Sequence, residues 1–194
     1  MNIPRWWVVL LAFLLMLFPV LDARRAGAVV VGDSAFADIA TVGEQAVPLR
    51  NAALYRYLNL ISVYAAGLYL PAEARGDFCR PDTPKRLELS YLVEIAAGDF
   101  ARSANHVLAK NLSSEDAAAL ADRIETLHRA YRDVDKGDRY SLTYIPGEGT
   151  ELALNDSVLV KVDGADFACA YFGIWLGPEP IDDGLRDRLL QLRE

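Results

Sequence analysis

The sequence predicts an α+β domain in which helices cover one face of a large antiparallel sheet. Three observations indicate this fold class. Residues 86–93 alternate like a strand, and two helical patterns follow over residues 98–134. Three short apolar segments separated by turn residues come next, and two further helical patterns end the chain. Strands interrupted by helices and then resumed, with helices last, are typical of one sheet with its helices on a single face.

The opening part of the domain is less regular. Residues 33–48 are short and mixed in character, and we expect an opening strand pair there. Residues 54–69 are rich in apolar and aromatic side chains, and their period alone leaves helix and strand open. Residues 86–93 place Leu87, Leu89 and Tyr91 on one face and polar side chains on the other, which predicts a half-buried strand.

Two helices are expected in the middle of the chain. Residues 98–112 repeat apolar side chains at helical spacing, beginning with Phe100. Ser113 or Ser114 is suited to cap a second helix that runs to about Val134.

The last third of the chain is expected to hold three strands and two helices. Turn residues separate the three apolar segments, and Gly177-Pro178 stops the first of the two helices. The final helix is amphipathic. These predicted elements are strands 140–145, 150–154 and 158–162, and helices 167–176 and 183–192.

The first 28 residues have the layout of a targeting segment. Arg5 supplies a positive start, residues 6–21 are apolar and uncharged, and residues 26–28 (Ala-Gly-Ala) offer a cleavage site. We therefore expect a signal peptide, residues 1–28, and one exported domain, residues 29–194, that is periplasmic or secreted. The alternative is an uncleaved anchor that keeps the protein near a membrane, although the run is shorter than the roughly 20 residues that span a bilayer.

The charge of the chain limits its partners. The formal net charge is −7 at pH 7. An acidic surface disfavours nucleic acid and anionic lipid as partners, because both need clustered positive charge. The sequence does not predict an oligomeric state.

Cys79 and Cys169 are the only cysteines. In an oxidising compartment they could form a disulfide, and as two unpaired, buried residues they would also pack well. The sequence contains no metal-binding spacing of cysteines or histidines. We therefore expect no metal site and no cofactor.

In the stretch from Leu49 to Pro71, Arg56 lies inside an otherwise apolar, strand-like pattern. The stretch resembles the first strand pair of the chalcone isomerase-like family, in which an arginine precedes a short turn and a Val-Tyr-x-x-x-Leu-Tyr-Leu-Pro run. The resemblance favours strands over a helix for residues 54–69. Further segments resemble the bacterial, exported branch of this family and occur in the same order. The resemblance therefore covers nearly the whole domain. These segments are Gly137-Asp138, residues 144–150, Asn155 and residues 166–178.

The resemblance also implies an open-faced sandwich with a cleft between sheet and helices. In the plant enzymes, which cyclise a chalcone to a flavanone, the arginine lies in the substrate cleft, where a fixed cation stabilises negative charge. That position falls on Arg56. Tyr64 matches a threonine that helps to hold an ordered water. Phe100 and Val107, about two helical turns apart, match a tyrosine and an asparagine, so this cleft wall would be apolar.

Loss of these polar groups favours the non-catalytic relatives, some of which bind fatty acids with the carboxylate at the arginine. We therefore expect a binder of a small amphipathic carboxylate or phenolic ligand. Arg56 would anchor the anion, and the cleft would be lined by Tyr64, Phe100, Val107 and Phe172. One alternative is an isomerase, an intramolecular lyase of the chalcone-to-flavanone type, with Arg56 and Tyr64 as its catalytic residues. Another is an envelope protein-protein adaptor with a vestigial cleft. Arg56 could also be a structural or surface side chain.

Overall fold

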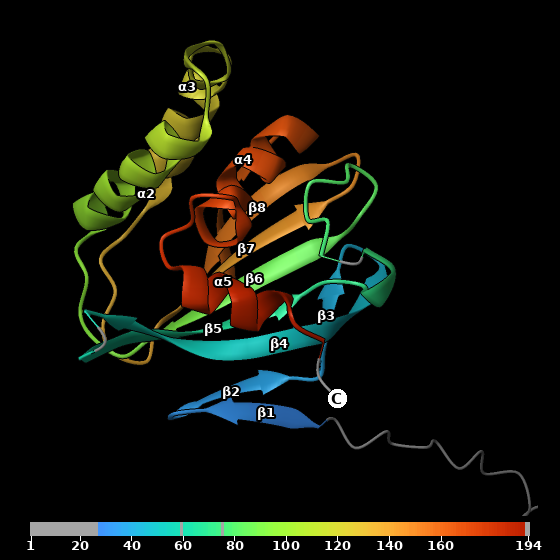
Figure 1. Ribbon diagram of the computed structural model, residues 1–194, viewed down its shortest axis with the longest axis vertical. Coiled ribbons are helices and arrows are strands. Elements are labelled where there is room, and N and C mark those ends of the chain that lie inside the picture. The colour runs from blue at the N-terminus through green and yellow to red at the C-terminus, as the bar shows by residue number, and fades with distance from the viewer. Residues whose placement is uncertain (1–26, 59, 75, 193–194) are drawn as a thin grey trace, which may run out of the picture.

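The computed structural model describes residues 27–58, 60–74 and 76–192. It contains a seven-stranded antiparallel sheet with strand order β3-β4-β5-β6-β7-β8-β9, and a separate hairpin formed by β1 and β2. Helices cover one face of the large sheet (Figure 1). The predicted fold class is therefore confirmed. The strands are β1 (Ala28–Val31), β2 (Ser34–Ala37), β3 (Ile39–Val42), β4 (Gln45–Tyr57), β5 (Ile61–Tyr69), β6 (Lys85–Tyr91), β7 (Arg139–Ile145), β8 (Gly149–Leu154) and β9 (Ser157–Val162).

The four longer helices lie close to their predicted positions. They are α2 (Ala97–Asn111), α3 (Ser114–Ala130), α4 (Ala165–Leu176) and α5 (Asp183–Leu190), and a short 3-10 helix, η1, spans Ala72–Ala74. Ser113 caps α3, as expected, because its hydroxyl accepts a hydrogen bond from the Asp116 N–H at 3.1 Å. No helix among the described residues is long and apolar enough to cross a membrane.

Both faces of the sheet are covered, but unequally. The inner face packs against α2, α3, α4 and α5 and forms the main hydrophobic core. Its strands contribute alternate residues, such as Leu87, Leu89 and Tyr91 of β6. A smaller core around Phe36 and Tyr69 lies between the outer face and the β1–β2 hairpin. This hairpin passes below β4 in Figure 1.

The β4–β5 hairpin positions the functional region. The chain reverses between Leu58 and Leu60, and the Leu60 N–H donates to the Tyr57 carbonyl at 3.1 Å. Tyr55 pairs with Tyr64 across the two strands, and a register irregularity follows directly, so that Arg56 pairs with Ser62. The short turn that the family resemblance implies after Arg56 is therefore present.

One predicted element has narrower bounds than expected, and one predicted boundary was wrong. The strand pair expected within residues 33–48 is present over residues 39–48, because β3 pairs with the start of β4, from Ile39 with Pro48 to Val42 with Gln45. Residues 34–37 form β2, which pairs back with β1. Gly32 and Gly43, both at φ +59°, make the two tight turns that this arrangement requires. The helix expected to reach Val134 ends at Ala130, because Val134 instead forms a β-bridge with Ile95. The predicted signal peptide, residues 1–28, lies almost entirely outside the described residues.

Cys79 and Cys169 form a disulfide. The bond ties the loop before β6 to α4 across 90 residues of sequence. This settles the question that the sequence left open. Since α4 also packs on the sheet, the bond restrains the helix that forms one wall of the cavity described below.

Replacing both cysteines, Cys79→Ser with Cys169→Ser, should lower the free energy of unfolding by about 2–5 kcal/mol, because the unfolded chain regains the entropy of a long open loop. Urea unfolding of the oxidised protein and of the double variant measures the difference. Reduced wild-type protein is the control and should match the variant. Equal stability of the oxidised and reduced protein would contradict the expectation.

Candidate functional site: an aromatic cavity between sheet and helices

A cavity of about 820 Å³ lies between the inner face of the sheet and helices α2 and α4. The strands contribute alternate inward residues, including Leu87 and Leu89 of β6 and Leu142 of β7. The volume is within the range of small-molecule pockets, and the lining is predominantly apolar and aromatic. The cavity can therefore hold a largely apolar organic molecule.

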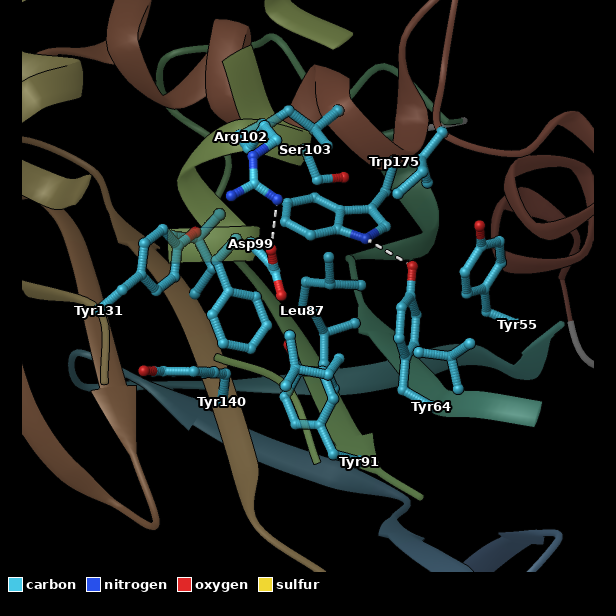
Figure 2. A pocket seen from close by; sticks show the side chains of 18 of the residues that line it. Tyr55, Tyr64, Leu87, Tyr91, Asp99, Arg102, Ser103, Tyr131, Tyr140 and Trp175 are labelled. Atoms are coloured by element: carbon cyan, nitrogen blue, oxygen red, sulfur yellow. Dashed lines mark hydrogen bonds and ion pairs between the residues drawn. The ribbon is translucent and has the colours of Figure 1, made fainter. Parts of the chain in front are cut away.

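Helix α2 supplies one wall and the mouth. Phe100, Ser103 and Ala104 lie on one helical face, at spacings of three and four residues, and all three line the cavity. Asp99 and Arg102 form an ion pair beside them. Both side chains are more than half exposed, at 51% and 79%, so they lie where the cavity meets solvent. Figure 2 shows this pair at one end of the lining side chains, with Tyr91 and Tyr140 at the other.

Helix α4 supplies the opposite wall. The indole Nε1 of Trp175 donates a hydrogen bond to the Tyr64 hydroxyl at 3.1 Å (Figure 2). One turn earlier on α4, the hydroxyl of Tyr171 is 2.8 Å from that of Tyr131, which follows α3. These two polar contacts tie α4 to β5 and to the end of α3.

The aromatic rings of the lining contact one another in a continuous series. Tyr55 stacks on Tyr64 with ring centroids 4.8 Å apart, and Tyr64 meets the edge of Tyr91 at 5.8 Å. Phe100 then lies 5.5 Å from Tyr91 and 5.1 Å from Tyr131. Aromatic pairs at such distances add to the stability gained by burial, so the wall is expected to be stiff.

The buried tyrosine hydroxyls stay protonated at neutral pH. Burial raises the pKa of Tyr64 and of Tyr91 above the ordinary value near 10. Tyr91 is only 2% exposed, and its hydroxyl makes no hydrogen bond to any residue that the structure describes. Because buried polar groups rarely lack a partner, this hydroxyl is available to a polar atom of a bound molecule.

The predicted site residues divide into two groups. Tyr64 and Phe100 line the cavity, from β5 and α2 respectively. Val107 and Phe172, which we also expected in the lining of the cleft, do not line this cavity. Val107 is 3% exposed and lies in the core. Phe172 is fully buried on another side of α4, where its ring lies 5.5 Å from the ammonium group of Lys85.

Arg56, which we expected to anchor a ligand, lies outside the aromatic cavity. Its side chain is exposed and borders a separate, more polar hollow of about 520 Å³ beside α5, together with Asp182 and Arg188. The register explains the difference. Tyr55 and Tyr64 are cross-strand partners and share the inner face, so Arg56, the next residue of β4, leaves that face.

This placement removes the support for the isomerase alternative. That hypothesis needs Arg56 and Tyr64 to act on one substrate, but only Tyr64 borders the cavity. The part of the chain that the structure describes also contains no group of three or more His, Cys, Asp or Glu residues that could hold a metal ion.

Several cavity residues were missed from the sequence, although signals for some of them were present. Tyr91 lies on the alternating face of the predicted strand 86–93, and Ser103 and Ala104 are helical neighbours of Phe100. Trp175 lies in the predicted helix 167–176, and at 9% exposure it belongs to both the core and the cavity wall. No sequence signal distinguished Arg102 from other exposed helix residues.

A model of the chalcone isomerase-like family matches residues 28–191. The chain belongs to the chalcone isomerase-like family. Among solved structures, this chalcone isomerase-like chain is similar to an Arabidopsis thaliana fatty-acid binding protein, with a TM-score of 0.63 and 20% sequence identity over 84% of this chain and 96% of that one. At this identity the likeness shows the fold. No curated protein matches the sequence.

The Trp175–Tyr64 hydrogen bond should have a measurable effect on stability. Tyr64→Phe leaves the buried indole N–H without its acceptor and should lower the free energy of unfolding by about 1–3 kcal/mol in urea unfolding. Tyr91→Phe is the matched control, because it removes a hydroxyl that bonds to none of the described residues. Equal losses in the two variants would contradict a stabilising role for the hydrogen bond.

Proposed function

We propose that this protein binds, without transforming it, a small amphipathic ligand of the fatty-acid class in the aromatic cavity. The observation that carries the proposal is the cavity itself, whose volume of about 820 Å³ remains open inside an otherwise well-packed core. Protein interiors are normally close-packed, so a space of this size with an apolar lining suits an apolar occupant. The fatty-acid binding protein of similar fold supports this class of ligand.

The mouth of the cavity suits the polar head of such a molecule. The apolar chain would lie among the leucines and aromatic rings, and the carboxylate would lie at the mouth, near Arg102 and Ser103. Arg102 replaces Arg56 as the proposed anion partner, because Arg102 borders the cavity and offers several N–H donors. Its present partner, Asp99, would have to share it with the ligand.

The protein is also proposed to act after export. The N-terminal sequence has the layout of a signal peptide, and the Cys79–Cys169 disulfide is of the kind that persists in oxidising compartments. A bacterial origin and the periplasm or extracellular space as the place of action are parts of this proposal.

Ligand occupancy should depend on the open mouth. Mass spectrometry of organic extracts from gently purified protein should yield a fatty acid or a related amphiphile. Ser103→Trp should lose it, because the indole would fill the mouth from an exposed position. Asn105→Trp, exposed on the same helix but not part of the lining, is the matched control and should retain it. An empty wild-type protein that also fails to bind added long-chain fatty acid would refute the proposal and favour the adaptor alternative.

Two arginines distinguish the proposed anion partner from the one predicted from sequence. Arg102→Ala should weaken binding of a long-chain fatty acid by about tenfold, the lower end of the effect of a hydrogen bond to a charged group, because the side chain is exposed. Arg56→Ala should leave the affinity unchanged. Titration of a fluorescent fatty acid measures both dissociation constants. The opposite ranking of the two variants would restore Arg56 as the anchor.

A further inference from the structure

The hairpin tip between β4 and β5 is strongly apolar and exposed. We define the hairpin tip as Tyr57, Leu58, Leu60 and Ile61, whose exposed fractions are 53%, 71%, 83% and 55%. Half of the large hydrophobic side chains that are exposed within the described residues lie in this one turn. Scattered exposed hydrophobic residues are normal, but a cluster of them marks an interaction site.

The backbone of the tip adds a second observation. Leu58 has φ +51°, in the left-handed region that glycine and asparagine favour and that a leucine seldom adopts. A turn that served only to reverse the chain would be more stable with a small or polar residue at this position. The presence of an exposed leucine therefore indicates a role for its side chain.

A free cation lies directly behind the tip. Arg56 is exposed and makes no hydrogen bond or ion pair with any part of the chain that the structure describes. Arg188 borders the same hollow and is also exposed. Apolar side chains at an extremity with a basic group just behind them match the layers of a phospholipid surface, where acyl chains lie beneath phosphate groups.

The tip also borders the cavity. Tyr57 belongs to the tip and lines the cavity, and Tyr55 and Val63, further along the two strands, line it as well. In Figure 1 the β4–β5 hairpin reaches the left-hand edge of the molecule, near the start of α2. A surface that covered the tip would therefore lie next to the mouth of the cavity.

We propose that the hairpin tip inserts into the surface of a phospholipid bilayer, with Arg56 at the headgroup phosphates, and that it presents the cavity mouth to the membrane. The second part rests on the proposed function, whereas insertion of the tip does not. The net charge of −7 opposes attraction to anionic lipid. Insertion is therefore driven by the apolar side chains, and zwitterionic phosphatidylcholine, which still offers phosphate to Arg56, is a sufficient target.

The insertion is tested with an environment-sensitive fluorophore on the full chain. Both native cysteines are in the disulfide, so Leu60→Cys provides a single thiol for the label. With phosphatidylcholine vesicles, its emission should shift to the blue and be quenched by nitroxides on the acyl chains. Val158→Cys, at 58% exposure on β9, is the matched control and should not respond. Equal responses at the two positions would overturn the proposal, as would a label at residue 60 that responds only when membrane proteins are present.

A second variant distinguishes membrane insertion by the hairpin tip from ligand binding in the cavity. Leu58→Ser, Leu60→Ser and Ile61→Ser together should weaken partition onto phosphatidylcholine vesicles by about tenfold or more, given the apolar surface removed. None of the three residues lines the cavity, so the affinity for fatty acid added from solution should not change. Uptake of fatty acid from vesicles should slow. If the cavity binds nothing, the label at residue 60 still decides whether the tip inserts, and unchanged partition of the triple variant would refute insertion.

Discussion

The structure depends on covering the inner face of the seven-stranded sheet. Each leucine or phenylalanine removed from water there contributes about 1.5–3 kcal/mol, so the inward rows of β5 to β8 require helices over them. Helix α4 is apolar on nearly all sides and packs closely. Helix α2 is amphipathic, and it presents the small side chains of Ser103 and Ala104 beside Phe100. The cavity is the space that these small residues leave opposite the aromatic residues of the sheet.

Tyrosine suits this wall because it combines a large apolar ring with one polar atom. Four of the cavity tyrosines use that atom within the protein. Tyr64 accepts from Trp175, Tyr131 and Tyr171 pair with each other, and Tyr140 bonds to the backbone of Arg132. The rings can thus surround an open space without many unsatisfied polar groups, which would otherwise be costly in a buried setting.

The sequence predicted the strands and helices of the fold well where the period was clear, as in residues 86–93 and in the two central helices. The site was harder, because it depends on register. Arg56 and Tyr64 would share a face on one straight strand, but the pairing of Tyr55 with Tyr64 turns the arginine away from the aromatic cavity. Val107 shares a helical face with Phe100, yet it lies further along α2, within the part of the core that is filled. A one-residue difference in strand register, or a local difference in core packing, cannot be recognised from a single sequence.

Every pair of neighbouring strands in the large sheet is also consecutive along the chain. Such pairing closes short loops and loses little entropy, which favours rapid assembly. Strands β6 and β7 are also consecutive, but the connection between them is long, because it contains α2 and α3. Cys169 lies in α4, which follows the final strand, and it is bonded to Cys79 in the loop before β6. The disulfide therefore joins a loop that precedes this long connection to a helix that follows the last strand, and it keeps the two together even when the strands and helices between them separate.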